Sequence, residues 1–451
     1  MTEDAHILSV VELSHQIHSN ELSPLDLVDA LLPRIKQYES TVQAWVTIDR
    51  DSVCQYAKIY SDDAAKGMFQ GLLHGIPLGV KDIYYTKDMD TTAGSQILTG
   101  FRPGYDATPV QRLKTSGAII LGKTETTEFA TFDPAPTRNP WNLDHTPGGS
   151  SSGSAAAVAI RMCPAALGSQ TGGSIIRPAA YCGVVGLKPT YGRISRYGVI
   201  PVSWSLDHVG TFTRSVEDAA LLLEVLAGPD SKDPTSVAYP IPTYRSTLDA
   251  PVPPRLGLVQ GFFHDRAQAE VQNNIRTTIR SLESHNATIM DTPLPTSFNA
   301  VHAAHRVIMI SEVATIHKTI FQTRMHEYRP NLRSMIASGL LIDATTYLDA
   351  QRIRSHFIKD ALSLFDHCDC LVMPSTPSAA PKGLTSTGDP AFNSPWSFCG
   401  FPALSLPSGV TKEGLPLGIQ LVAQPFCEDI LLQAGAWCEQ VINFIQCPPN
   451  V

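Results

Sequence analysis

Residues 146–180 constrain the fold of this chain more than any other segment, because they join two clusters of glycine and serine through an apolar stretch. The clusters are 148–154 and 170–174, and alanine, valine and isoleucine are frequent between them. Glycine and serine at this density are typical of flexible linkers, but linkers do not carry an apolar core segment. The alternative is a backbone that turns sharply and points its N–H groups at a ligand. We therefore predict an active site with a serine nucleophile here.

A serine hydroxyl needs a base that accepts its proton, and neither cluster contains a histidine. The apolar run 75–80 leads instead to a single lysine, Lys81. Burial in such a run lowers the pKa of a lysine below its reference value of about 10.4. The neutral amine can then act as the base, so the sequence predicts this role for Lys81.

Three motifs connect these features to a known family: GIPLGVKD at 75–82, TPGGSSSGSAAAVA at 146–159 and SQTGGSIIRPA at 169–179. Further similar segments, such as CLVMPSTPSAAP at 370–381, follow in the family's order over nearly the whole chain. In these motifs the chain resembles the amidase signature family of serine hydrolases. The resemblance implies a single large α/β/α domain around a mixed, mainly parallel central sheet.

The resemblance also implies a Ser–cisSer–Lys triad made of Ser174, Ser150 and Lys81. Ser174 is then the nucleophile, and Ser150, after a cis peptide bond from Gly149, relays the proton to Lys81. The resulting acyl-enzyme is hydrolysed by water, and no cofactor or metal ion is expected. The oxyanion hole is expected to consist of the backbone N–H groups of Thr171, Gly172, Gly173 and Ser174.

Arg177, Gly149 and Ser151 are the candidates for substrate binding. Many family members carry an acid four residues before the nucleophile and an arginine two residues after it. Here these positions are Gln170 and Ile176, and the arginine stands one residue later. An arginine at this offset resembles a clamp for a substrate carboxylate, which a guanidinium binds bidentately. A buried structural arginine that binds loop carbonyls is the alternative, and the sequence leaves both open.

Two motifs indicate other classes of site, and we reject both. Residues 117–124 match the phosphate-binding pattern GxxxxGK[ST], but 118–121 are predicted to be a buried strand whose N–H groups pair in a sheet. Residues 149–153 match the GxSxG elbow, which should follow a strand, whereas a loop is predicted before them. His208, which could complete a Ser–His–Asp triad, is interpreted as structural or pocket-lining.

The chain has 451 residues, 43% of them hydrophobic, and can bury a large core. No shift in composition marks a linker, so we predict one domain over 1–451, in which 300–365 form a helical region on the substrate side. We predict helices over about 23–38 and 215–226, and strands over 256–259 and 370–373.

The net charge is −8 and no basic stripe is present, so we expect no nucleic-acid partner. The sequence shows no signal peptide and no apolar span of about 20 residues, which favours a cytoplasmic protein without membrane contact. Nine cysteines without a CxxC pair fit a reducing compartment. We expect a monomer or homodimer that acts on a small-molecule amide or carbamate.

The predicted function is hydrolysis of amide C–N bonds. The same acyl transfer can open anilides, esters and carbamates, so a urethanase acting on aryl carbamates is one alternative. A second alternative is the amidase subunit of a glutamine-dependent tRNA amidotransferase, which the chain also resembles. That alternative predicts a stable partner, a tunnel for ammonia and partner-dependent glutaminase activity.

Overall fold

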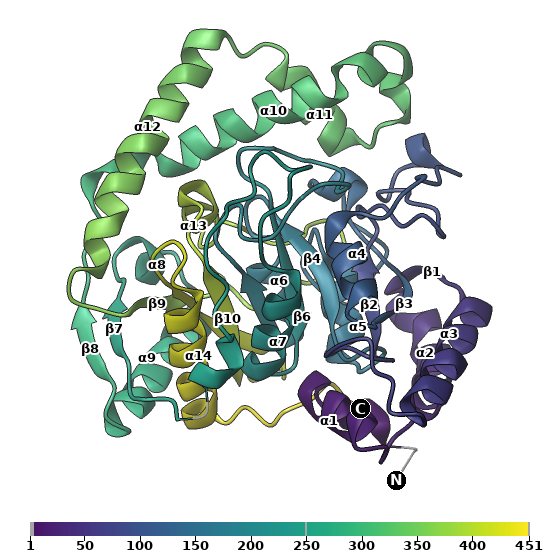
Figure 1. Ribbon diagram of the computed structural model, residues 1–451. Coiled ribbons are helices and arrows are strands. Elements are labelled where there is room, and N and C mark those ends of the chain that lie inside the picture. The colour runs from purple at the N-terminus through teal and green to yellow at the C-terminus, as the bar shows by residue number, and fades with distance from the viewer. Residues whose placement is uncertain (1–3, 249, 450–451) are drawn as a thin grey trace.

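The computed structural model describes residues 4–248 and 250–449, and an eleven-stranded sheet forms its centre (Figure 1). The order of the strands across the sheet is β1-β3-β2-β4-β6-β5-β10-β11-β9-β7-β8. The strands are β1 (Trp45–Ile48), β2 (Pro77–Lys81), β3 (Ile119–Thr124), β4 (Ala166–Gln170), β5 (Val185–Lys188), β6 (His208–Thr213), β7 (Arg255–Leu258), β8 (Thr288–Asp291), β9 (Cys370–Pro374), β10 (Ala403–Val410) and β11 (Pro416–Val422).

Helices cover both faces of this sheet (Figure 1). They are α1 (Val10–His18), α2 (Pro24–Val42), α3 (Arg50–Ala64), α4 (Thr108–Thr115), α5 (Ser152–Ala159), α6 (Ile176–Cys182), α7 (Val216–Leu226), α8 (Phe262–Asp265), α9 (Ala269–Ser284), α10 (Val301–Arg324), α11 (Pro330–Gly339), α12 (Ala344–Leu362), α13 (Ser394–Cys399) and α14 (Glu428–Ile442). The predicted α/β class is confirmed.

The sheet is mixed, as expected, but the expectation of mainly parallel strands is wrong. Six neighbouring pairs of strands are antiparallel. Four pairs are parallel, within the blocks β3-β2-β4 and β9-β7-β8. Parallel neighbours need a crossover, which is usually a helix. In the described chain, the connections 189–207 and 411–415 contain no helix, so β5 pairs antiparallel with β6, and β10 with β11.

Local signals set the ends of several elements as predicted. Ser23 caps α2, because its side chain accepts a hydrogen bond from the backbone N–H of Asp26, and Pro24 follows at the first helical position. The helix continues past the predicted end, to Val42. The predicted strands at 256–259 and 370–373 are β7 and β9; β7 begins and ends one residue earlier, and β9 ends one residue later.

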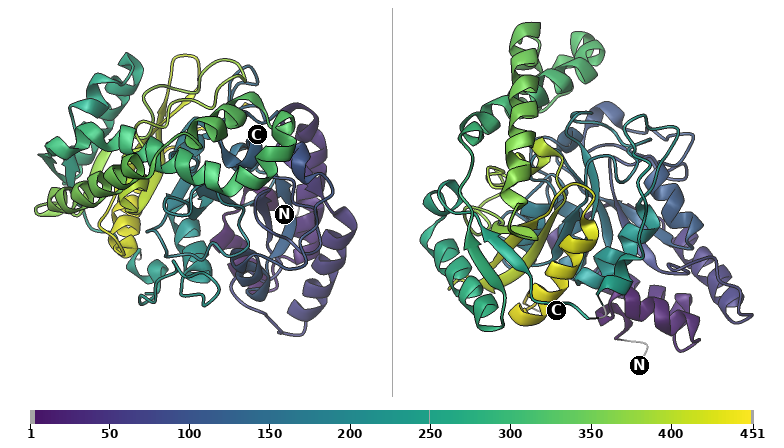
Figure 2. Two further views of the ribbon diagram at one scale, coloured as in Figure 1. Left: turned by 90° about the horizontal axis from the view of Figure 1, so that it is seen from above. Right: turned by 60° about the vertical axis from the view of Figure 1, so that its left-hand side comes forward.

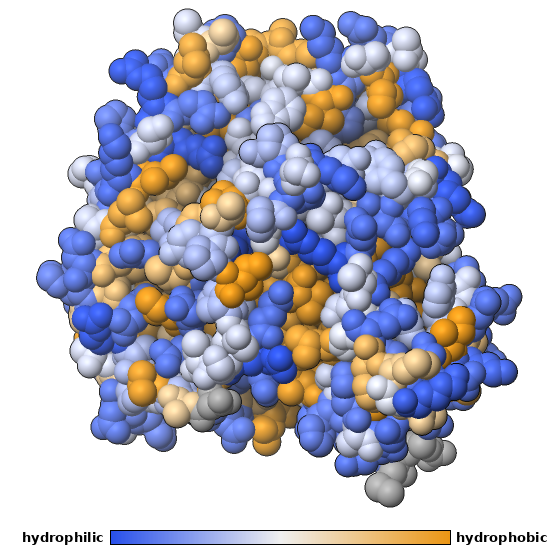
Figure 3. Space-filling view, in the orientation of Figure 1, coloured by the Kyte–Doolittle hydropathy of each residue, from blue (hydrophilic) through white to orange (hydrophobic). Residues whose placement is uncertain are grey.

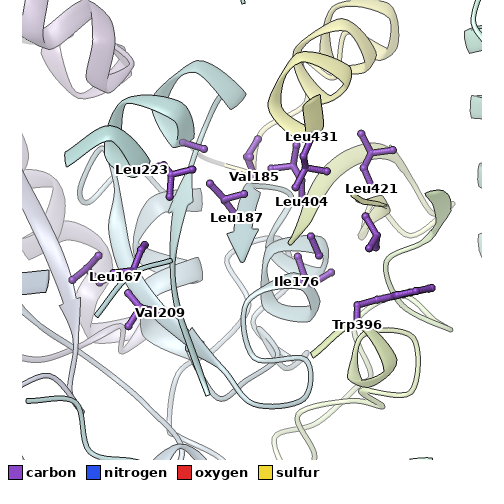
Figure 4. Close-up of a cluster of buried hydrophobic side chains, with 14 of the residues drawn as sticks. Leu167, Ile176, Val185, Leu187, Val209, Leu223, Trp396, Leu404, Leu421 and Leu431 are labelled. Atoms are coloured by element: carbon purple, nitrogen blue, oxygen red, sulfur yellow. The ribbon is translucent and has the colours of Figure 1, made fainter. Parts of the chain in front are cut away.

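The core lies on both sides of the central strands. Leu187 of β5 and Leu404 of β10 are paired across the sheet, and Figure 4 shows them next to Leu223 of α7 and Leu431 of α14. Ile176 of α6 lies on the other side of the sheet in the same view. All five side chains are almost completely buried. Because side chains alternate along a strand, each face of the sheet receives its own helices.

Residues 300–365 contain α10, α11 and α12, which lie together at one end of the molecule (Figure 2). Hydrophobic patches reach the surface among hydrophilic ones in this upper region (Figure 3), and Leu341 and Leu348 are exposed. The assignment of this region to the substrate side and the single-domain organisation both stay predictions. No helix of the described ranges combines the length and apolar character needed to cross a membrane.

Candidate active site

Lys81 stands at the end of β2 with a completely buried side chain. Its Nζ donates hydrogen bonds to Ser150 Oγ at 2.7 Å and to Ser169 Oγ at 2.8 Å. Pairing of β2 with β3 and β4, which flank it in parallel, fixes the backbone that carries the amine. The strand therefore holds the lysine against the first serine cluster.

Burial lowers the pKa of Lys81 well below 10.5, and the negative charge of Asp207 opposes only part of this effect. Removing an ammonium group from water disfavours its charged form, so the neutral amine is favoured here. A neutral amine can accept a proton from the hydroxyl of Ser150. The electrostatics of the site thus fit the base predicted from the sequence.

The first serine cluster is packed tightly around Ser150, which is buried and follows a cis peptide bond from Gly149. A Cβ atom at Gly149 would lie 2.7 Å from the Thr387 methyl group, so no larger residue fits without a shift. Ser151 is buried, and its Oγ lies 3.3 Å from both the N and the O atoms of Ser169. Gly149 and Ser151, both predicted to bind substrate, are thus occupied by protein contacts.

The second cluster forms the turn between β4 and α6, and Gln170 holds this turn in place. Its Oε1 accepts hydrogen bonds from the N–H groups of Ile175 at 2.8 Å and Ile176 at 3.0 Å. Its Nε2 donates to Ser397 Oγ at 3.0 Å. Gln170 therefore takes the place of a family acid and supports the segment that carries Ser174.

In the segment 171–174, side chains from other elements donate hydrogen bonds to the carbonyl groups of Thr171 and Gly172. His305 Nε2 donates to the carbonyl of Thr171 at 3.0 Å, and Ser397 Oγ donates to the carbonyl of Gly172 at 2.9 Å. In the described chain, the N–H groups of Gly172, Gly173 and Ser174 find no protein acceptor. Unpaired N–H groups beside a nucleophile can stabilise an oxyanion, as the sequence predicts for this segment.

Arg177 in α6 is buried and binds three protein oxygens. Its Nη2 donates to the carbonyl of Gly149 at 2.6 Å and to Thr387 Oγ1 at 3.1 Å. Its Nη1 donates to the carbonyl of Gly388 at 2.8 Å. These contacts match the structural alternative, in which the arginine satisfies loop carbonyls.

A cavity of about 510 Å³ opens in front of Ser174, and residues distant in sequence form its wall. Its volume lies within the usual range for small-molecule sites. The second serine cluster, the loop at 130–132, α10, α11 and the segment 389–394 contribute the lining. The lining residues are Ala130, Thr131, Phe132, Thr171, Gly172, Gly173, Ser174, Arg177, Val202, His302, His305, Arg306, Met309, Ile310, Asn331, Ser334, Met335, Ser338, Asp389, Pro390, Ala391 and Ser394.

A family model described as Amidase matches residues 26–432. The chain belongs to the amidase family. It is 36% identical to a glutamyl-tRNA(Gln) amidotransferase subunit from Sulfurihydrogenibium sp., over 95% of this chain and 96% of that protein. Family members are enzymes that act on C–N bonds, and the arrangement around Lys81 is one that such chemistry can use.

Two solved structures of similar proteins extend the comparison. One is an inhibitor-bound vestigial protein complex described as revealing the origins of an s-triazine catabolic enzyme, with a TM-score of 0.91, 31% identity and coverage of 98% of this chain and 100% of that chain. The other is the native peptide amidase from Stenotrophomonas maltophilia, with a TM-score of 0.84, 30% identity and coverage of 98% of both chains. The expected amidase signature fold is confirmed.

The phosphate-binding motif and His208 both have structural roles within this amidase fold. Residues 119–124 form β3, and Lys123 is buried in an ion pair with Asp82 at 2.9 Å, so its amine is not available to a phosphate. His208 Nδ1 lies 2.7 Å from the carbonyl of Leu206, and burial lowers the pKa of its imidazole well below 6.5. The cavity wall does not include His208.

Sequence reasoning missed two polar residues that contact the predicted catalytic residues of this amidase-family chain. Ser169 accepts the second hydrogen bond of Lys81, and Asp207 Oδ1 accepts one from Thr171 Oγ1 at 2.5 Å. Ser169 lies directly before the second cluster, which was a usable signal. Asp207 stands next to His208 without a motif of its own, and only the pairing of β4 with β6 brings it close.

Proposed function

We propose that this amidase-family chain hydrolyses amides through Ser174, Ser150 and Lys81. One observation carries the proposal: Lys81 Nζ lies 2.7 Å from Ser150 Oγ in a fully buried setting, and Ser174 lines a cavity. A desolvated amine in contact with a hydroxyl is the arrangement that a serine nucleophile needs for its activation.

In the proposed acylation step, Ser174 Oγ attacks the carbonyl carbon of the amide. Its proton moves to Ser150 Oγ while the proton of Ser150 moves to Lys81 Nζ. The substrate oxygen becomes an oxyanion, which the free N–H groups of residues 172–174 stabilise. One such donor is worth roughly 3–4 kcal/mol of transition-state stabilisation in a serine hydrolase.

The tetrahedral intermediate then collapses, and the C–N bond breaks. The relay returns the proton from Lys81 to the leaving nitrogen, and the acyl group stays on Ser174 as an ester. Water attacks this ester with the same relay as base, which releases the acid and restores the hydroxyl. All groups that react in these steps belong to the chain itself, to the substrate or to water.

Within this proposal Arg177 is a positioning residue. It binds the carbonyl of Gly149, the residue immediately before Ser150, and also the segment 387–388. These bonds connect α6, which follows the nucleophile, to the serine of the relay. The arginine therefore acts through Ser150 and does not contact the reacting atoms.

The test is covalent labelling with a fluorophosphonate, followed by intact-mass measurement and peptide mapping. We expect one label on Ser174, none in Ser174→Ala, and unchanged labelling in the control Ser284→Ala, whose serine is exposed on α9. Turnover of a primary amide should fall to background in Ser174→Ala. Labelling of another serine, or turnover by Ser174→Ala, would contradict the assignment.

A second candidate function is that of an amidase subunit in a glutamine-dependent amidotransferase. The relatives that carry the name of a glutamyl-tRNA(Gln) amidotransferase support it, since they are 36–37% identical over nearly the full chain. The chemistry at Ser174 is the same, with glutamine as the amide. The test compares the purified lone chain on glutamine and on a neutral primary amide. Turnover of the neutral amide favours a free-standing hydrolase, whereas glutaminase activity that requires partner proteins favours the assembly.

Carbamates remain within the scope of the proposed acyl transfer. An aryl carbamate offers the same carbonyl carbon to Ser174, and its cleavage releases an amine, an alcohol and carbon dioxide. The apolar part of the cavity wall, which includes Met309, Met335 and Phe132, supports an apolar substrate portion. The measurement is kcat/KM for an anilide and its carbamate analogue in parallel.

A further inference from the structure

We infer that the substrate carries a carboxylate at the end remote from the scissile amide, and that Arg306 binds it. The inference rests on the proposed function and names the substrate class. Arg306 belongs to α10 and lines the same cavity as Ser174. It is exposed, and within the described ranges its guanidinium has no hydrogen-bond acceptor and no carboxylate partner.

The second arginine of the cavity wall is not available for this task. Arg177 already donates to the carbonyls of Gly149 and Gly388 and to Thr387 Oγ1. To bind a substrate carboxylate, Arg177 would have to give up hydrogen bonds that hold Gly149, the residue before Ser150, in place. Arg306 has no bonds to give up, so it is the cation that an incoming anion meets.

Polar side chains that line the same cavity as Arg306 can complete an anion site. Asn331, Ser334 and Ser338 of α11 line the cavity and are spaced three and four residues apart, which puts them on one helix face. Hydroxyl and amide groups can donate to a carboxylate that the guanidinium holds.

The only carboxylate among the described lining residues is already paired. Asp389 Oδ2 accepts from Arg266 at 3.2 Å, and Oδ1 accepts from the N–H of Ala391 at 2.9 Å. No free negative charge therefore balances Arg306 inside the wall. A cavity lined by excess charge of one sign attracts ligands of the other sign.

The distance between the two ends of the site is fixed by contacts of α10. His305, the residue before Arg306, donates to the carbonyl of Thr171, and His302 Nε2 donates to the carbonyl of Ala391 at 2.9 Å. These bonds connect the helix to the two segments that flank Ser174. The site therefore selects an amide whose carboxylate lies at a defined separation from the carbonyl carbon.

The test uses linear primary monoamides of dicarboxylic acids, each paired with the methyl ketone in which –COCH₃ replaces –COO⁻. We expect wild type to prefer the acid at one chain length. Arg306→Gln should lower kcat/KM for the acid by about tenfold or more, mainly through KM, as expected for a charge-assisted contact. Arg306→Lys should recover part of the loss, and the ketone should be unaffected.

Lys318→Gln is the matched control, because Lys318 lies on α10, is exposed and is not part of the cavity wall. It should leave the ratio of acid to ketone unchanged. An equal loss for acid and ketone in Arg306→Gln, or no preference for any acid in wild type, would overturn the inference. Glutamine also carries a carboxylate remote from its amide, so the same loss is expected for it.

Calorimetry separates this inference from the proposed function. Binding of the preferred acid is measured on Ser174→Ala and on the same protein with Arg306→Gln. Weaker binding in the double variant supports the carboxylate contact, and equal binding overturns it. Turnover by Ser174→Ala contradicts the proposed function and leaves the comparison of the two affinities valid.

Discussion

At the scale of single residues, the site depends on how burial changes the pKa of Lys81 and on how little space surrounds Gly173. Lys81 has two hydroxyl partners but no carboxylate in hydrogen-bond contact within the described chain. Without a paired anion, desolvation dominates its pKa. The lysine is therefore suited to accept a proton and not to bind an anion.

This environment predicts a pH dependence of the acylation rate. The Lys81 amine must be neutral to accept a proton, so kcat/KM should rise with pH through the lowered pKa of Lys81 and level off well below pH 10.5. The measurement is a pH–rate profile with a neutral amide. Lys81→Arg, which stays protonated, should be inactive across the range. An acid limb centred near 10.5 would contradict the proposed desolvated base.

Two neighbouring glycines of the proposed oxyanion hole, Gly172 and Gly173, give a matched pair of variants. A Cβ atom at Gly173 would lie 2.6 Å from Asn393 Oδ1, whereas one at Gly172 meets nothing closer than 3.6 Å. Gly173→Ala must therefore shift the segment, and kcat should fall by about 10²–10³, as when an oxyanion donor is lost. Gly172→Ala should change kcat far less. Steady-state kinetics check both, and equal losses would contradict the argument.

At the scale of elements, buried side chains connect segments that lie far apart in sequence. Arg177 connects α6 to the segments at 149 and 387–388. Asp133 connects a loop of the cavity to the start of α11, since its carboxylate accepts from the N–H groups of Asn331 at 3.1 Å and Leu332 at 2.7 Å. These contacts set the shape of the site indirectly.

For Arg177 we expect a loss that does not depend on the substrate. Arg177→Met leaves buried carbonyls without donors, which should destabilise the fold by about 2–4 kcal/mol. It should lower kcat/KM by a similar factor for a carboxylated and a neutral amide. Urea unfolding and kinetics on both substrates check this. A loss of kcat/KM for the carboxylated amide alone would show instead that Arg177 binds the substrate carboxylate.

For Asp133 we expect a loss of both stability and substrate affinity. Asp133→Ala removes the cap of α11, which should cost about 1–2 kcal/mol and raise KM, because α11 carries part of the cavity wall. Asp343→Ala is the control: Asp343 caps α12 through the N–H of Thr346 at 2.8 Å, away from the cavity. It should lose similar stability with an unchanged KM. An equal change of KM in Asp133→Ala and Asp343→Ala would contradict the proposed effect of Asp133 on the cavity.

At the scale of the whole molecule, the sequence predicted the parts that local chemistry determines. The motif around Lys81 and the two serine clusters were predicted to form one site; Lys81 Nζ and Ser150 Oγ are in contact, and the catalytic roles stay a prediction. The α/β class and the capped helix at 24–42 also followed from local patterns. The directions of the strands did not, because pairing depends on connections such as 189–207, whose path no local pattern encodes.

The role of Arg177 also could not be predicted from local patterns, which left its two interpretations open. Its spacing from Ser174 fitted a clamp, but its partners Thr387 and Gly388 lie more than 200 residues further along the chain. Likewise, Arg306 had no motif, and its place in the wall depends on how α10 packs over residues 171–174. Contacts of this range are decided by packing and not by periodicity.

One part of the cavity wall comes from the glycine–serine segment 171–174, whereas another large part comes from α10 and α11, more than 100 residues later in the chain. The proposed reacting groups and the proposed substrate-binding groups thus lie in separate stretches of sequence. Exchange of residues 301–339 between homologues can therefore redirect such an enzyme to a new amide and keep its reaction. Relatives that share every catalytic residue need not share a substrate.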